Sequence, residues 1–91
     1  MGKVQKEDLE KIISLLDVLA QDTSIPRNVR MRLQEAEEKL KTENDTDVSI
    51  SSAIYALDEV SSDINLPMHA RTMIWNLMSE LESLKNTAEN G

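Results

Sequence analysis

The sequence of 91 residues contains no cysteine and no glycine between its two ends. Without cysteine the chain has no disulfide, no thiolate nucleophile and no thiolate ligand for a metal. The two glycines, Gly2 and Gly91, stand at the ends, so no glycine-rich loop is available to hold a phosphate. Tight hairpins between strands also lack the residue that they favour. The absence of internal glycine favours helices over strands.

Basic side chains and long apolar runs are also scarce. Residues 1–47 carry 8 basic and 11 acidic side chains, residues 48–91 carry 2 and 6, and the net charge of −3 and −4 makes the chain acidic at −7. Nucleic-acid binding neutralises phosphates with Lys and Arg, so this balance disfavours a nucleic-acid partner. No apolar run approaches the roughly 20 residues of a membrane helix, and the start "MGKVQKEDLE" lacks the apolar stretch of a secretory signal. We therefore expect a cytoplasmic protein without a membrane association.

The residues that usually carry catalysis or bind metals are missing. His69 is the only histidine, so no histidine cluster can bind zinc. Asp63 or Asp58 is expected near it, but no serine has a fixed place beside it to act as a nucleophile. The stretch "NDTD" at residues 44–47 lacks the glycine and the final glutamate of a calcium loop. We predict no catalytic residues, no metal and no cofactor, and a protein that is not an enzyme.

The sequence repeats itself at a spacing of 41 residues. When residues 13–40 are laid on residues 54–81 without a gap, seven of the 28 pairs are identical. The identical pairs are Ile13/Ile54, Leu16/Leu57, Asp17/Asp58, Asp22/Asp63, Pro26/Pro67, Arg30/Arg71 and Leu40/Leu81. Duplication is the simplest explanation, and it gives two units, at about 9–42 and 50–84, within one domain that spans residues 1–91.

Each unit has the pattern of two helices joined by a turn, because apolar residues recur at steps of three and four. In the first unit they are Leu9, Ile12, Ile13, Leu16, Leu19 and Ala20, then Val29, Leu33, Ala36 and Leu40. In the second they are Ile50, Ala53, Ile54, Leu57 and Val60, then Ala70, Ile74, Leu77 and Leu81. Pro26 and Pro67 open the second helix of each unit and push Ile25 and Leu66 toward extended backbone, where both side chains can turn inward.

We therefore predict four helices, at about 3–21, 26–42, 47–61 and 67–86, with Thr46 or Asp47 capping the third. A period near 40 is also reminiscent of HEAT-type repeats, but such arrays need about three or more units to bury a continuous face. Two units with short connections favour closure. The prediction is an all-α fold, an up-and-down four-helix bundle built from two pseudo-repeated helical hairpins.

The repeated charges predict structural contacts at the turns. Residues equally far from a turn lie at the same level of an antiparallel hairpin. The predicted ion pairs between helices are Asp17–Arg30 and Asp58–Arg71. Asp22 and Asp63 precede the second helix of each unit, where a carboxylate suits the free N–H groups.

The two units differ in their additional apolar residues, which lie on the first and fourth helices. These are the candidate interface residues Leu15, Val18, Met68, Trp75 and Met78. One interpretation is that they pack the first helix against the fourth. The other is an exposed patch that binds a second copy or a partner protein, since tryptophan often anchors interfaces and methionine adapts to varied surfaces.

A second candidate site lies at the turn end. In an up-and-down bundle both turns meet there, beside two helix N-termini that attract anions. The candidate anion-binding residues are Arg27, Arg30, His69 and Arg71. The neighbouring aspartates compete for the same cations.

Two segments carry a resemblance to a known family. The stretches "LPMHARTMIWNLMSELE" (residues 66–82) and "IPRNVR" (residues 25–30) resemble an uncharacterised family of small archaeal proteins of unknown function, over roughly residues 9–84. The resemblance implies an archaeal origin and an up-and-down helical bundle, and it brings no activity. The function predicted is a non-enzymatic protein–protein interaction module, with self-association through the first and fourth helices as one form. The alternative is binding of an anion or an RNA phosphate by the arginines at the turn end.

Overall fold

The computed structural model describes residues 6–90, with side chains for residues 7–85, and this part of the chain contains four α-helices and no strand. The helices are α1 (Lys6–Ala20), α2 (Arg27–Thr42), α3 (Thr46–Ser61) and α4 (Met68–Asn90). The predicted all-helical fold with four helices is confirmed. The predicted start of the first helix at residue 3 lies outside the described residues.

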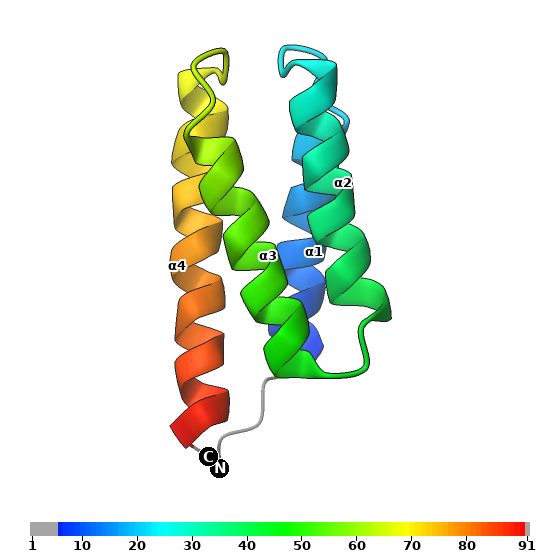
Figure 1. Cartoon of the computed structure of the whole chain (residues 1–91), viewed down its shortest axis with the longest axis vertical. Coiled ribbons are helices and arrows are strands. Elements are labelled where there is room, and N and C mark those ends of the chain that lie inside the picture. The colour runs from blue at the N-terminus through cyan, green and yellow to red at the C-terminus, as the bar shows by residue number, and fades with distance from the viewer. Residues whose placement is uncertain (1–5, 91) are drawn as a thin grey trace.

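The four helices lie side by side along a molecule 40 Å long. Figure 1 shows the α1–α2 and α3–α4 connections together at one end and the α2–α3 connection at the other. Each helix therefore runs opposite to the one before it. Among the described residues, the pairs in extensive contact are α1 with α2, α2 with α3, and α3 with α4, as short connections impose.

Two helix ends differ from the prediction. Helix α4 continues to Asn90 rather than ending near residue 86, because neither proline nor glycine interrupts the chain between Pro67 and Gly91. Helix α3 begins at Thr46, and its N-cap is Asp45, whose side chain accepts a hydrogen bond from the backbone N–H of Val48. The cap predicted at Thr46 or Asp47 is therefore wrong, because the helix starts one residue earlier.

The predicted apolar stripes form the core. The side chains with no exposed surface come from all four helices: Leu16, Leu33, Ile50, Ala53, Leu57, Ala70, Ile74 and Leu81. Leu9, Ile13 and Ile54 from the same stripes are partly buried and pack against this core. Burial of a leucine or isoleucine contributes about 1.5–3 kcal/mol, so these side chains are the main source of stability.

The apolar residue before each proline turns inward, as the sequence predicts. Ile25 and Leu66, each directly before a proline, are buried in the core. Pro26 has the extended backbone of an N-cap, with φ −55° and ψ 145°. Its carbonyl oxygen accepts a hydrogen bond from Arg30 N at 3.0 Å, and the Pro67 carbonyl accepts one from Arg71 N at the same distance.

The aspartates of the turns act locally. Asp22 Oδ1 accepts a hydrogen bond from Ser24 N at 2.9 Å, and Asp63 Oδ1 accepts one from Asn65 N at 2.8 Å. Both carboxylates therefore hold the turn, and the prediction that they meet the free N–H groups of the following helix is corrected. A short aspartate side chain reaches the backbone N–H two residues ahead of it, which closes an Asx-turn.

One carboxylate lies inside the molecule. Glu37 on α2 is buried, and its Oε2 lies 3.0 Å from Nζ of Lys41, one helical turn further on. This hydrogen bond raises the pKa of Lys41. The ion pair compensates the loss of water around the buried carboxylate. At the 41-residue spacing the counterpart of Glu37 is the apolar Met78.

Candidate interaction surface

Three of the five candidate interface side chains are exposed to solvent. Val18 on α1 is 61% exposed, and on α4 Met68 and Trp75 are 70% and 54% exposed. Leu15 and Met78 are partly buried and pack against the core. Leu15 lines a hollow between α1 and α4, whereas Met78 lines one between α3 and α4, so the interpretation that these residues pack α1 against α4 stays a prediction.

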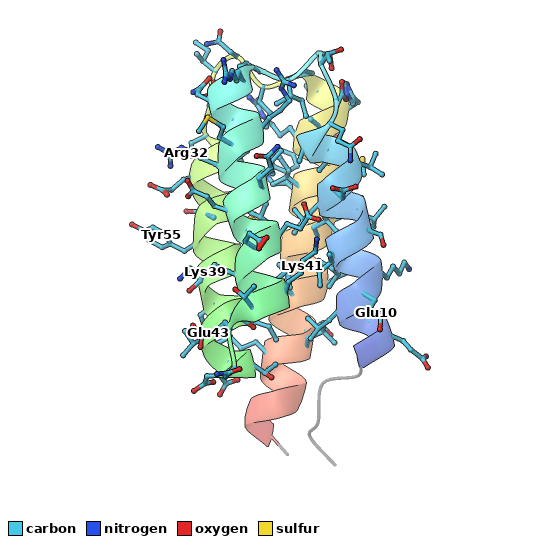
Figure 2. All side chains as sticks on the ribbon, turned by 90° about the vertical axis from the view of Figure 1, so that its right-hand side faces the viewer. Glu10, Arg32, Lys39, Lys41, Glu43 and Tyr55 are labelled. Carbon is cyan, nitrogen blue, oxygen red and sulfur yellow. The ribbon has the colours of Figure 1, made fainter. Side chains whose placement is uncertain are left out.

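Other apolar side chains are also exposed, on different faces. Tyr55 on α3 is 70% exposed and points away from the helices in Figure 2. Met31 on α2 is 53% exposed and Ile64, in the turn before α4, is 90% exposed. Single exposed apolar side chains are common on soluble proteins, so grouping on the surface matters more than exposure alone.

Helices α1 and α4 are separated by a groove, here called the α1–α4 groove. Its main part has a volume of about 510 Å³, and its apolar lining consists of Leu15, Met73 and Leu77. The charged residues Lys11 and Glu80 line the same part and also a smaller extension of about 230 Å³. The groove exists because α1 and α4, unlike the other neighbouring helices, are not in extensive contact within the described residues.

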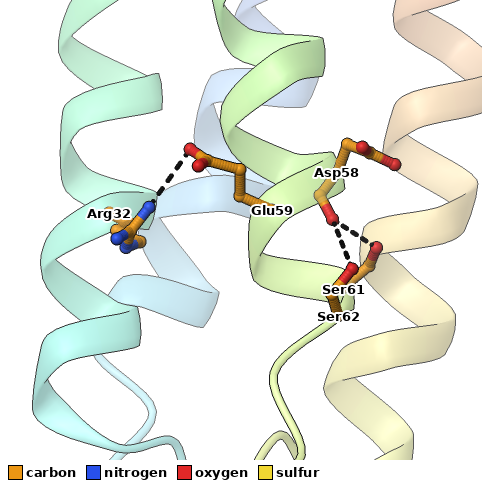
Figure 3. Close-up of polar contacts among 5 residues, drawn as sticks. All are labelled: Arg32, Asp58, Glu59, Ser61 and Ser62. Atoms are coloured by element: carbon orange, nitrogen blue, oxygen red, sulfur yellow. Dashed lines mark hydrogen bonds and ion pairs between the residues drawn. The ribbon is translucent and has the colours of Figure 1, made fainter.

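The opposite side of the molecule, between α2 and α3, is closed by charge. Arg32 Nη1 lies 3.1 Å from Glu59 Oε1, and both side chains are about half exposed, at 51% and 47% (Figure 3). At the 41-residue spacing, the counterparts of Arg32 and Glu59 are Met73 and Val18. In the sequence repeat, the two residues of this ion pair therefore correspond to two apolar residues, one on α4 and one on α1.

The turn end is joined by an interaction between the first turn and α4. His69 Nε2 lies 2.8 Å from Asp22 Oδ2. The hydrogen bond with His69, followed by those from the Ser24 side chain and backbone, lowers the pKa of Asp22 from 3.8 to about 2. The sequence suggested Asp63 or Asp58 as the neighbour of His69. The predicted meeting of the two turns at one end allows this contact across 47 residues, but it does not define which aspartate reaches His69.

The two predicted ion pairs, Asp17–Arg30 and Asp58–Arg71, are not among the ion pairs of the described residues. Asp17 instead accepts a hydrogen bond from Gln21 Nε2 at 2.8 Å, within one turn of α1. Equal distance from a turn fixes the level of two residues along their helices. It does not fix how far each is rotated about its helix axis, and the prediction failed for this reason.

The other three members of the predicted pairs make different contacts. Arg71 Nη2 donates to the Asp63 carbonyl oxygen at 2.9 Å. The carbonyl oxygen of Asp58 accepts hydrogen bonds from the hydroxyls of Ser61 and Ser62 (Figure 3). The Nε atoms of Arg30 and Arg71 are buried and have no hydrogen-bond partner in the structure.

The four candidate anion-binding residues therefore do not act as one free cluster. His69 already has a carboxylate partner, Arg71 donates to a carbonyl, and Arg27 is exposed. Anion binding at the turn end stays a prediction. In the described part of the chain, no group of three or more His, Cys, Asp or Glu side chains is arranged to bind a metal ion. The described helices include none with the length and apolar character needed to span a membrane.

The fold and this surface define a class: a small, acidic, four-helix protein with apolar side chains exposed on its first and last helices. Comparison with known proteins gives the family. The model of an uncharacterised protein family, UPF0147, matches residues 1–84, and the chain belongs to this family.

Relatives and solved structures agree with this assignment. A UPF0147 protein of Archaeoglobus fulgidus is 45% identical over 84 residues, which cover 92% of this chain and 97% of the relative. A second relative, the UPF0147 protein MJ1419 of Methanocaldococcus jannaschii, is 42% identical over 91% of this chain and 90% of its own. The crystal structure of a UPF0147 protein from Thermoplasma acidophilum has a TM-score of 0.82 at 36% identity, covering 89% of this chain and 96% of that one. The predicted resemblance to an uncharacterised archaeal family is confirmed.

Proposed function

We propose that this protein is a non-enzymatic protein-binding module that acts through the surface of α1 and α4. The observation that carries the proposal is the exposure of Val18, Met68 and Trp75 on these two helices. The α1–α4 groove, lined by Leu15 and Met73, adds a hollow between the same two helices. An apolar patch or groove at the surface is typical of protein interaction sites. A half-exposed tryptophan offers a large anchor at little cost in conformational entropy.

We also propose an architecture that makes such a surface possible. The four helices form an up-and-down bundle of two copied hairpins. The 41-residue repeat, the alternating direction of the helices and the two turns at one end support it. In this arrangement the α2–α3 and α1–α4 sides correspond to one another. After duplication, the residues on the α1–α4 side could change while the α2–α3 side kept its packing.

The absence of enzymatic activity is part of the proposal. General acid–base catalysis needs a titratable group that can reach a substrate proton. The one histidine is engaged by Asp22, and the α1–α4 groove combines three apolar side chains with Lys11, Glu80, Asn76 and Ser79. This composition suits a side chain of a partner better than a polar substrate.

The experiment is comparative affinity capture from an extract of an archaeal cell that contains the protein. Three baits are used: the natural protein, Trp75→Ala and the control Met31→Ala. Met31 is 53% exposed on α2, close to the 54% of Trp75, so each variant removes an apolar side chain that is about half exposed. We expect partners that bind the natural protein and the control but bind Trp75→Ala at least about fivefold more weakly, as for an anchor worth more than 1 kcal/mol. Equal binding by all three baits would contradict the proposal.

A second candidate function is supported by one observation at the turn end. Arg27 is exposed and Arg30 is partly exposed at this end, and neither forms an ion pair with a described residue, so both guanidinium groups are available to an anion or an RNA phosphate. Such binding weakens with salt. A labelled RNA that binds at low salt to the natural protein, and not to an Arg27→Ala/Arg30→Ala variant, would support this function. An RNA that fails to bind at low salt would end it.

A further inference from the structure

Exposed side chains of opposite charge stand on the two sides of the α1–α4 groove, and Asp8 adds an acidic side chain on the α1 side of its smaller part. Lys11 on α1 and Glu80 on α4 both line the groove, and both are exposed. Neither forms an ion pair or a side-chain hydrogen bond with another described residue. They nevertheless lie at the same level of the molecule, because the same two parts of the groove contain both of them.

The apolar residues of the groove also come from both helices. Leu15 on α1 and Met73 on α4 line one part of the groove. On the α2–α3 side, the counterpart of Met73 is Arg32, which pairs with Glu59 and closes that side within the chain. The α1–α4 side has no such closure in the described residues. Its apolar and charged groups are therefore available to another molecule.

From this pattern we infer that a second copy of the chain occupies the groove, related by a two-fold axis parallel to the helices. The inference rests on the proposed function and names its partner. A two-fold axis in this direction brings α1 of one copy against α4 of the other, and every contact occurs twice. Lys11 then faces Glu80 of the second copy, and Leu15 faces its Met73.

At the level of Lys11 and Glu80, charge favours this arrangement over the other symmetric one. A two-fold axis running across the groove places α1 against α1 and α4 against α4. At the level of Lys11 and Glu80 it would bring like charges together, which opposes association. The parallel axis satisfies both charged residues and covers the apolar lining at the same time. Each copy carries both members of every contact, one on α1 and one on α4, so two copies of the chain suffice.

The test is a charge exchange between the two sides of the groove. Lys11→Glu and Glu80→Lys are made separately, and the mass of each protein in solution is measured by analytical ultracentrifugation over a series of concentrations. We expect the natural protein to be a dimer. Each variant should associate at least about tenfold more weakly, because two like-charge contacts form. An equimolar mixture of the two variants should restore the dimer, since both contacts between unlike variants are then attractive.

A matched control separates this contact from a general effect of charge. Lys39→Glu on α2 changes the net charge by the same amount as Lys11→Glu, at an exposed residue away from the groove (Figure 2). It should leave the dimer unchanged. Circular dichroism of each variant checks that the helices are intact, and the mixture itself shows that both variants can still form the native contact.

The outcomes distinguish this inference from the proposed function. A natural protein that stays a monomer at all concentrations overturns the dimer. If Trp75→Ala still loses captured partners, the binding module stands with another occupant. A dimer that ignores both charge variants overturns the parallel two-fold arrangement. A monomer combined with capture that does not depend on Trp75 overturns both proposals.

Discussion

Two substitutions on α1, two residues apart, measure how the structure divides this helix between core and surface. Leu16 has no exposed surface, whereas Val18 is 61% exposed. A buried leucine changed to alanine loses its transfer free energy and leaves a cavity, which together cost about 2–5 kcal/mol. We therefore expect Leu16→Ala to lower the free energy of unfolding by about 3 kcal/mol.

The same estimate for Val18→Ala is close to zero. Full burial of a valine is worth about 1.5 kcal/mol. With 61% of the residue exposed, the side chain gains only about 0.6 kcal/mol on that scale. Alanine has a higher helix propensity, which returns up to about 0.7 kcal/mol. The two terms nearly cancel, so the change should stay within about 0.5 kcal/mol of zero.

The assay is urea unfolding followed by circular dichroism and by the fluorescence of Trp75, the one tryptophan. Proteins of this size are stable by about 0.05–0.15 kcal/mol per residue, so a loss of about 3 kcal/mol is a large fraction. It should lower the melting temperature by roughly 12–24 °C and the urea midpoint by about 1–3 M. Coincident transitions for the two probes would justify two-state treatment.

The comparison has a clear contrary result. If Val18→Ala destabilised the protein as much as Leu16→Ala, Val18 would be covered in solution and the assigned surface of α1 would be wrong. If Leu16→Ala cost less than about 1 kcal/mol, the core itself would be misplaced. Measurement at two protein concentrations separates a cover by a second copy, which depends on concentration, from a cover within the chain.

Three further predictions concern polar contacts. The hydrogen bond with His69 lowers the pKa of Asp22 to about 2, so this group contributes stability above pH 4 that is lost as the pH falls toward 2; Asp22→Asn should flatten that part of the profile of urea midpoint against pH, and an unchanged profile would refute it. Asp45→Ala removes the N-cap of α3 and should destabilise the protein by about 0.5–2 kcal/mol in urea unfolding; no measurable change would mean that the cap is not formed. A double-mutant cycle with Arg32→Ala and Glu59→Ala should give a coupling of only about 0–1 kcal/mol, because both side chains are half exposed; a value above about 2 kcal/mol would contradict this exposure.

Local sequence patterns predicted the parts of the structure that depend on one helix at a time. A helix with an apolar residue every third or fourth position must bury that face, and for this reason Leu16, Leu57 and Ile74 were placed correctly in the core. The inward position of Ile25 followed from the restriction that Pro26 imposes on the residue before it. These features need only the periodicity of the chain and the geometry of proline.

Contacts between helices were predicted less well. The pairing of Asp17 with Arg30 failed because the level of a residue along a helix does not define its rotation toward a neighbour. The neighbour of His69 was missed because Asp22 approaches it from a turn 47 residues away. The position of Lys11 and Glu80 on the two sides of one groove could not be seen in the sequence, since each is an ordinary surface residue of an amphipathic helix.

The sequence by itself determined four helices, their core faces and the two proline turns, because these follow from short-range periodicity and backbone restriction. Only the tertiary structure decided that α2 and α3 close against each other through Arg32 and Glu59 while α1 and α4 leave a groove between them. The physical reason is that the distance and rotation between two packed helices depend on all the side chains between them. The pattern along one helix does not contain that information.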